Sequence, residues 1–392
     1  MLGVGMLAQI AGTLLSNAPL FLIPYLHLER GLTLVQAGLL ASTPLFATTL
    51  SLVAWGVVVD RIGERLSLAM GLSIVTLGGL GSALFSSIQS TSYVALGASW
   101  LVAGIGAAST NSASGRLVVG WFPPERRGTA MGIRQTALPL GIGLAAFIVP
   151  VVAEADGLRA ALLVPTVVCA VATIAVTTLV VDPPRPSREE AESLGQLANP
   201  YRGSTSLARI HVASMLLVIP QLTVWSYMLI WLIDDRGWST TAAGVLVGST
   251  QLLGSMARIG VGWWSDRVGT RLGPMRVVAV ATLVTMVALG GLEETRLAVA
   301  IMIVATAVTV ASNGLAFTAV AERGGPFWSG RAMGVHNTGQ YLVAALVPPL
   351  VGALVTGQGY AVAFAAVGLF ALLAVPVVPV RDERGDESWT HR

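Results

Sequence analysis

Long apolar runs, separated by short clusters of charged, glycine and proline residues, cover almost the whole sequence. Twelve such runs can be drawn, and each is long enough to cross a hydrocarbon core of about 30 Å as a helix. They occupy residues 2–26, 33–59, 66–88, 92–120, 128–153 and 158–181, and then 208–233, 239–265, 274–292, 296–320, 329–355 and 360–380. The pattern predicts an all-α membrane protein with twelve transmembrane helices.

The composition supports lipid as the main solvent of this chain. Hydrophobic residues make up 54% of the sequence and charged residues only 11%, whereas a soluble domain has about 25% charged residues. All 23 basic residues are arginines, and sixteen of them fall in segments on the side that holds both termini, against four on the other side. The positive-inside rule therefore predicts a multi-pass protein of the inner (cytoplasmic) membrane with both termini in the cytoplasm. The net charge of +3 then belongs to loops at the membrane, and no nucleic-acid partner is expected.

One long polar stretch divides the twelve runs into two sets of six. Residues 182–208 contain several prolines and most of the charges between the two sets, which is typical of a linker. The sequence therefore predicts an N-terminal six-helix bundle at 1–181, a cytoplasmic linker at 182–208, a C-terminal six-helix bundle at 209–381 and a cytoplasmic tail at 382–392.

Both halves carry the same turn, G-x-x-x-D-R-x-G-x-R, which begins at Gly56 and again at Gly262. Farther along each half, R-G-T-A-M-G at 127–132 recurs as S-G-R-A-M-G at 329–334. The first glycine of the turn allows a close approach between helices, and the second allows a sharp reversal of the chain. An aspartate between them can face the positive end of a nearby helix. Two copies of one pattern predict two pseudo-symmetric bundles related by a parallel repeat.

This doubled turn, together with twelve predicted spans, resembles the hallmark of the major facilitator superfamily over the whole chain. The resemblance implies the major facilitator fold, with a central cavity, and a transport function that requires no cofactor. In that family the aspartate of the turn acts as a gate latch, a role that passes by match to Asp60 and Asp266. The gating residues implied by the match are Gly56, Asp60, Arg61, Gly63, Arg65, Gly262, Asp266, Arg267, Gly269 and Arg271.

Charged residues inside the apolar runs are the first candidates for substrate contact, because such groups are costly in lipid. All 20 acidic residues lie in loops or at the ends of runs, whereas three arginines lie within runs. Arg134 has His336 as its repeat mate, and a guanidinium can form two parallel hydrogen bonds to a carboxylate or phosphate-like group. Alternatively, Arg134 pairs with Glu125 at the cytoplasmic edge. Arg258 is a candidate for the cavity or for a structural pair, while Arg116 is expected at the membrane interface.

Uncharged polar and aromatic side chains extend the predicted substrate site. The family fold places helices 1, 4, 7 and 10 around the cavity, and four of the candidates form two pairs of repeat mates at offset 202. Each could instead form an interhelical hydrogen bond worth about 0.6 kcal/mol. These candidates are Gln9, Asn17, Asn111, Gln135, Gln221, Trp225, Asn313 and Asn337.

The absence of catalytic motifs predicts that the protein is not an enzyme. Without lysine there is no phosphate-binding P-loop, and the lone Cys169 provides no metal-ligand set. The leading hypothesis is a secondary transporter that moves a small solute, preferably an organic or inorganic anion, by alternating access, as a functional monomer in the lipid bilayer. A coupling proton or ion remains open. Two alternatives are a drug or natural-product efflux transporter and a non-transporting membrane sensor or scaffold on the same fold.

Overall fold

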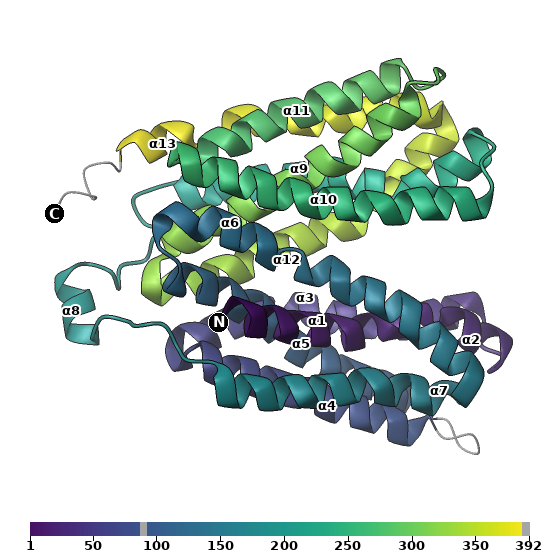
Figure 1. Ribbon diagram of the computed structural model, residues 1–392, viewed down its shortest axis with the longest axis horizontal. Coiled ribbons are helices and arrows are strands. Elements are labelled where there is room, and N and C mark those ends of the chain that lie inside the picture. Colours follow the sequence, from purple (N-terminus) through teal and green to yellow (C-terminus); the bar gives the residue numbers. More distant parts are fainter. Residues whose placement is uncertain (87–91, 386–392) are drawn as a thin grey trace. The chain divides into compact units, whose positions relative to one another are not determined.

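The computed structural model describes residues 1–86 and 92–385, and in that part of the chain all regular elements are helical (Figure 1). The last positions of the predicted run 66–88 and residues 386–392 of the predicted tail lie outside the described residues. The helices are α1 (Leu2–Phe21), α2 (Ile23–Leu28), α3 (Leu34–Ile62), α4 (Glu64–Phe85), α5 (Tyr93–Trp121), α6 (Pro124–Arg134), α7 (Ala137–Leu179), α8 (Arg188–Ser193), α9 (Ser206–Ile230), the π-helix η1 (Trp231–Asp235), α10 (Thr240–Val268), α11 (Leu272–Gly291), α12 (Ala298–Val377) and α13 (Val380–Gly385).

Eight helical stretches of the described chain are long and apolar enough to cross a membrane. Two of them, Pro124–Leu179 and Ala298–Asp382, contain 56 and 85 residues, far more than the roughly 20 needed for one crossing. Glycines with positive φ interrupt both: Gly157 (81°) divides the first, and Gly325 (62°) and Gly359 (81°) divide the second. The first stretch thus supplies two spans and the second three. The other six stretches supply one span each. Together with α10, which is less apolar, these spans make up the predicted set of twelve.

The described helices form two compact units. The first unit consists of Met1–Trp121, Thr136–Leu197 and Gly324–Thr338, and the second of Phe122–Gln135, Ala198–Arg323 and the chain from Gly339 onward. Helix α6 therefore belongs to the second unit although the helices before and after it belong to the first. Conversely, a short stretch of α12 belongs to the first unit. The division into bundles at 1–181 and 209–381 stays a prediction from the sequence.

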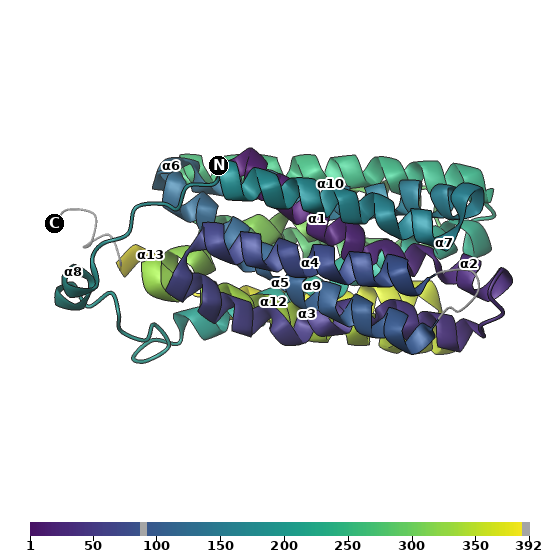
Figure 2. The same ribbon diagram turned by 90° about the horizontal axis from the view of Figure 1, so that it is seen from below.

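In the first unit, glycines let the helices pack backbone to backbone. Helix α4 packs against α5 and α7, and α1 packs against α7 and α5 (Figure 2). A Cβ atom on Gly78 would lie only 2.6 Å from the amide nitrogen of Ala103, and one on Gly71 would lie 2.8 Å from the carbonyl oxygen of Gly106. Because lipid chains are as apolar as leucine, such close contacts supply the van der Waals attraction that holds membrane helices together.

In the second unit, α6 lies along α10, as both ribbon views show. The core at the other end of this unit contains Trp231 of η1, whose ring meets Phe364 edge to face with 6.1 Å between centroids. The buried Trp231 indole donates a hydrogen bond of 2.7 Å to Glu293. A polar partner is required there because an indole N–H without one would be costly to bury.

Candidate functional site

The first copy of the repeated turn connects α3 to α4 through Gly63, whose φ of 93° is accessible to glycine and strained for other residues. Six residues before the end of α3, Gly56 touches the backbone of α12 within the first unit. A Cβ atom on Gly330 would lie 2.5 Å from the carbonyl oxygen of Gly56. The two helices can therefore cross this closely only because glycine occupies both positions.

Next to this crossing, the buried Asp60 carboxylate binds the backbone of α12. It accepts hydrogen bonds from the amide of Gly330 (2.8 Å) and from the amide of Arg331 (3.0 Å). Its counter-ion is Arg116 of α5, at 2.9 Å. We name the group formed by Asp60, Glu64, Arg116 and their contacts the Asp60 cluster. It joins α3, α5 and α12 through charge-assisted hydrogen bonds, which are stronger than neutral ones.

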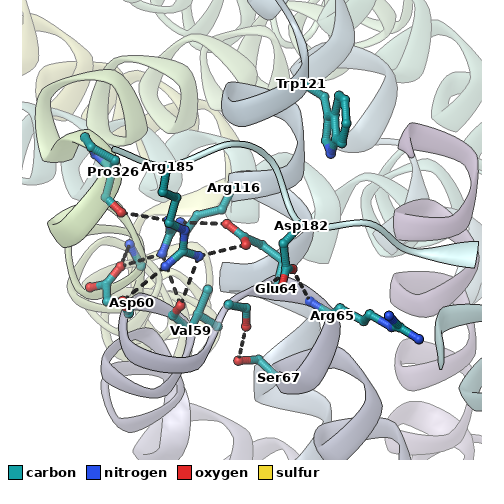
Figure 3. Close-up of polar contacts among 12 residues, drawn as sticks. Val59, Asp60, Glu64, Arg65, Ser67, Arg116, Trp121, Asp182, Arg185 and Pro326 are labelled. Carbon is teal, nitrogen blue, oxygen red and sulfur yellow. Dashed lines mark hydrogen bonds and ion pairs between the residues drawn. The ribbon is translucent and has the colours of Figure 1, made fainter. Parts of the chain in front are cut away.

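Glu64 completes the charge balance of the Asp60 cluster, and its side chain is fully buried. One oxygen forms an ion pair with Arg116 at 3.1 Å, and the other accepts a hydrogen bond from Arg185 of the linker at 2.7 Å. Figure 3 shows these two guanidiniums between Asp60 and Glu64. Arg116 also donates to the carbonyl of Pro326, at 2.8 Å. A buried carboxylate is stable only when it is paired in this way, because desolvation of an isolated charge is far more costly.

The second copy of the turn forms a similar group, the Asp266 cluster, in the second unit. Asp266 accepts hydrogen bonds from the amides of Gly128 (2.8 Å) and Thr129 (2.7 Å), and also from the Thr129 hydroxyl (2.7 Å). A Cβ atom on Gly128 would lie 2.5 Å from the carbonyl oxygen of Gly262, so α6 and α10 also cross backbone to backbone. The same aspartate and glycine contacts are therefore built twice, as the repeat predicts.

The counter-ion of Asp266 is Arg271, at 2.7 Å, which also donates to the carbonyl of Pro124. Arg271 lies 3.4 Å from Glu322 of α12, and Arg127 lies 3.5 Å from the same carboxylate. Burial by itself would lower the pKa of Arg271, but Glu322 and Asp266 together raise it above its usual value. This guanidinium is therefore a fixed positive charge at every pH that the protein meets.

A second polar region of the second unit collects several of the predicted substrate contacts. The Arg134 side chain is buried, and its guanidinium carbon lies 5.7 Å from the centre of the Phe317 ring. Arg258 is buried on α10, where a Cβ atom on Gly132 would lie 2.5 Å from its carbonyl oxygen. Helix α6 therefore contacts α10 where Gly132 meets Arg258. Arg134 is two residues after Gly132, so both arginines lie within about one helical turn of this contact.

Two uncharged candidates join this region from other helices. Asn313 of α12 donates a hydrogen bond of 3.1 Å to Gln221 of α9. Gly314, the next residue, lies near Gly132, with 3.5 Å between its ideal Cβ position and the backbone of α6. Helices α6, α9, α10 and α12 thus bring Arg134, Arg258, Asn313 and Gln221 into one unit. We call these four residues the polar group of the second unit.

The other predicted contacts are distributed over both units. In the first unit, Gln9 donates to Thr13 (3.2 Å), Asn17 donates to the Thr13 carbonyl (2.9 Å), and Asn111 is buried on α5. His336 and Asn337 are also buried in the first unit, and Asn337 donates to the Met333 carbonyl at 3.0 Å. In the second unit, Gln135 and Trp225 each have a buried nitrogen without a hydrogen-bond partner in the described chain. Arg134 and His336 fall in different units, so their pairing stays a prediction.

The structure shows the partners of Arg116 and adds residues that the sequence did not single out. Arg116, expected at the membrane interface, is enclosed by protein: only 4% of its side chain is exposed, and it forms ion pairs with two carboxylates. Its partner Glu64, the Arg185 that also binds Glu64, and Glu322 in the other cluster follow no motif. Their positions under the repeat offsets hold uncharged residues, Thr270 for Glu64 and Gly120 for Glu322. No sequence signal therefore indicated these contacts.

The sequence matches the model of the Major Facilitator Superfamily over residues 5–348. The chain belongs to this family of membrane transporters. An uncharacterized MFS-type transporter of Mycobacterium tuberculosis is 47% identical over 93% of this chain and 81% of its own length. More distant relatives are a probable hexose phosphate transport protein of Chlamydia trachomatis (23% identical, 70% of this chain and 66% of its own) and a probable sulfoacetate transporter of Cupriavidus necator (26%, 91% and 88%).

Solved structures confirm the fold of this transporter. The fucose:proton symporter of E. coli superimposes with a TM-score of 0.75 over 97% of this chain and 98% of its own, at 13% sequence identity. The predicted all-helical major facilitator architecture is therefore confirmed. At so low an identity the likeness concerns the fold and not the substrate.

Proposed function

We propose that this transporter moves a small organic anion across the cytoplasmic membrane by alternating access, with Arg134 as the principal contact of the anion. The observation that carries the proposal is a pair of buried arginines, Arg134 and Arg258, on spans without acidic residues near their middle. Ionisable groups within membrane spans are expensive to keep and usually serve transport. An anionic substrate would pair with the positive charge of these guanidiniums.

Arg258 strengthens this argument because its guanidinium has no hydrogen bond or ion pair to any residue within 1–86 and 92–385. Arg134 is flanked by the Phe317 ring, an environment that a planar guanidinium tolerates better than an ammonium group does. The names of two relatives point the same way, since hexose phosphates and sulfoacetate are both organic anions. Asn313 and Gln221 would add neutral hydrogen bonds from α12 and α9.

The two clusters would serve as the cytoplasmic gate of the same transport cycle. Asp60 and Asp266 each hold a helix through two backbone amides, contacts that must break when that helix moves away. The excess of arginine on the side of both clusters supports placing that side, and both termini, in the cytoplasm.

Transport by purified protein in liposomes tests the anion site. We expect saturable uptake of labelled sulfoacetate or glucose 6-phosphate, with a loss of at least about tenfold in Arg134→Gln, since one charge-assisted hydrogen bond is worth roughly 1.5 kcal/mol or more. Arg134→Lys should recover only part of this activity, because an ammonium cannot form the paired hydrogen bonds of a guanidinium. Arg202→Gln, which changes an exposed arginine of the linker, is the matched control.

Three outcomes would contradict the proposal in different ways. Unchanged uptake by Arg134→Gln would exclude the anion site. Export of uncharged amphipathic drugs that is insensitive to Arg134→Gln would favour the efflux alternative. A lack of flux for every anion, sugar and drug that stabilises the purified protein would favour a sensor or scaffold.

A further inference from the structure

The linker begins as part of the first unit. Helix α7 ends at Leu179, and three prolines at 183, 184 and 186 keep the following chain extended. The Trp121 indole donates a hydrogen bond of 3.0 Å to the carbonyl of Val181, and Pro183 packs against Gly120 at the end of α5. These contacts direct the side chains of Asp182 and Arg185 back toward the Asp60 cluster (Figure 3).

Asp182 supplies the cap that α4 lacks locally. The residue before α4 is Gly63, which has no side chain, and the first amides of the helix therefore need an acceptor from elsewhere. Asp182 accepts from the amide of Glu64 (2.9 Å) and from the amide of Arg65 (2.7 Å). A Cβ atom on Gly63 would lie 2.6 Å from the Asp182 carboxylate, so the glycine also makes room for this cap.

Arg185 binds both helices of the turn at once. It donates to the Glu64 carboxylate at 2.7 Å and to the carbonyls of Asp60 (3.2 Å) and Val59 (3.4 Å) at the end of α3. Glu64 in turn holds Arg116, which reaches Asp60 and the carbonyl of Pro326. The linker arginine therefore connects, through one buried glutamate, to the arginine that contacts α12.

We propose that Asp182 and Arg185 are positioning residues of the cytoplasmic gate, so that docking of the linker on the Asp60 cluster favours the closed state of that gate. Arg116 is shared between two carboxylates, and Arg185 neutralises the second of them. Without Arg185, Arg116 is drawn toward Glu64 and holds Asp60 and α12 less firmly. The Asp266 cluster is built differently: its second carboxylate, Glu322, comes from α12 and pairs with Arg127. The linker thus contacts only the Asp60 cluster among the described residues of the two clusters. Opening of the gate is expected to expose both clusters.

Cysteine labelling measures opening of the gate without any substrate. In a Cys169→Ser background, Ala332→Cys reports on the Asp60 cluster and its repeat mate Ala130→Cys reports on the Asp266 cluster. Both alanines are buried, at 0% and 2% exposure. A membrane-impermeant maleimide is added from the cytoplasmic side of inside-out vesicles, and the rate of labelling is recorded.

We expect Arg185→Gln to increase labelling of both reporters about tenfold, because a hydrogen-bonded charge pair is lost from the closed state. Asp182→Asn should act in the same direction, and Arg185→Lys should restore a rate close to that of the parent. Arg202→Gln, in the same linker but with an exposed side chain, is the matched control and should change neither rate.

Unchanged labelling in Arg185→Gln and Asp182→Asn would overturn the proposal. Faster labelling of Ala332→Cys alone would also overturn it, since this result means local release of the linker without opening of the gate. The inference depends on the proposed alternating access but not on the proposed anion. Arg185→Gln is therefore also tested in a protein that carries Arg134→Gln. If only the anion site is wrong, Arg185→Gln still increases the labelling rate in this protein.

Discussion

Asp60 and Asp266 form the same backbone contacts but receive their positive charges from different places. The counter-ion of Asp266 is Arg271, the last residue of its own turn, whereas the corresponding Arg65 binds the carbonyl of Thr177 instead. Asp60 pairs with Arg116 of α5, whose repeat position on α12 is Thr318. The second carboxylate of each cluster shows the reverse arrangement. In the Asp60 cluster it is Glu64, which belongs to the turn, and in the Asp266 cluster it is Glu322, which belongs to α12.

The comparison teaches which part of the repeat is constrained. Two crossing helices fix the position of the glycines and of the aspartate, because the backbone contact leaves no other geometry. A guanidinium on a long side chain can reach the same carboxylate from several starting points. The positive charge is therefore required, while the element that supplies it is free to differ.

The largest expected effect is the loss of Arg116, which leaves two buried carboxylates competing for other donors. We expect Arg116→Gln to destabilise the protein by about 4 kcal/mol, as for other broken buried ion pairs. Arg271→Gln should cost less, because Glu322 is partly exposed and Thr129 still donates to Asp266. Arg65→Gln should cost below about 1 kcal/mol. Thermal unfolding of the purified protein measures all three effects. If Arg65→Gln destabilised the protein as much as Arg116→Gln, the assignment of Arg116 rather than Arg65 as the counter-ion in the first cluster would be wrong.

The next effect concerns the glycine crossings, where the two clusters should respond alike. A methyl group on Gly56 or Gly262 would collide with a backbone carbonyl, and overpacking of this kind costs about 2–3 kcal/mol. Gly38→Ala and Gly260→Ala are matched controls in the same two helices, since a Cβ atom at either position meets nothing within 4 Å. Faster maleimide labelling is expected for the first pair only. Similar rates for the test and control variants would show that the crossings are not tight in the membrane.

A smaller effect should distinguish the clusters at the repeat pair Thr129 and Arg331. The Thr129 hydroxyl donates to Asp266 at 2.7 Å, so Thr129→Val should cost about 1.5 kcal/mol. Arg331 lies 3.5 Å from Asp60 and stacks over Trp328, with 4.5 Å between its guanidinium carbon and the ring centre. Arg331→Gln should cost less, because its partly exposed side chain is secondary to Arg116. The reverse order in the unfolding temperatures would contradict the assignment of counter-ions.

The smallest effect is expected for the second arginine of each turn. Arg61 and Arg267 are exposed, and Arg267 stacks over the Trp263 ring at 4.2 Å. A glutamine at either position should change the free energy of unfolding by less than about 1 kcal/mol, the usual range for exposed charges. A markedly larger loss in Arg267→Gln than in Arg61→Gln would show that the cation–π contact stabilises the second copy of the turn.

Most of the fold was predictable from the sequence because lipid imposes a simple rule on each span. Twelve apolar runs predicted helices whose observed ends differ by only a few residues, as α3 and α11 show against the runs 33–59 and 274–292. The run 239–265 likewise predicted α10, although this helix is less apolar than its neighbours. The run 128–153 did not predict a break between α6 and α7 at Gln135 and Thr136. The break precedes Pro139, which has no amide hydrogen to donate to the carbonyl of Gln135.

The sequence by itself determined the family, the paired turns and the positions of the glycines and aspartates, because those features are written in contiguous residues. Only the tertiary structure decided that Arg116 is a buried counter-ion, and that Asp182 and Arg185 of the linker reach the same cluster. The physical reason is distance along the chain. Partners separated by 56 and 121 residues are chosen by helix packing and by the need to neutralise a buried charge. Neither requirement leaves a local pattern in the sequence.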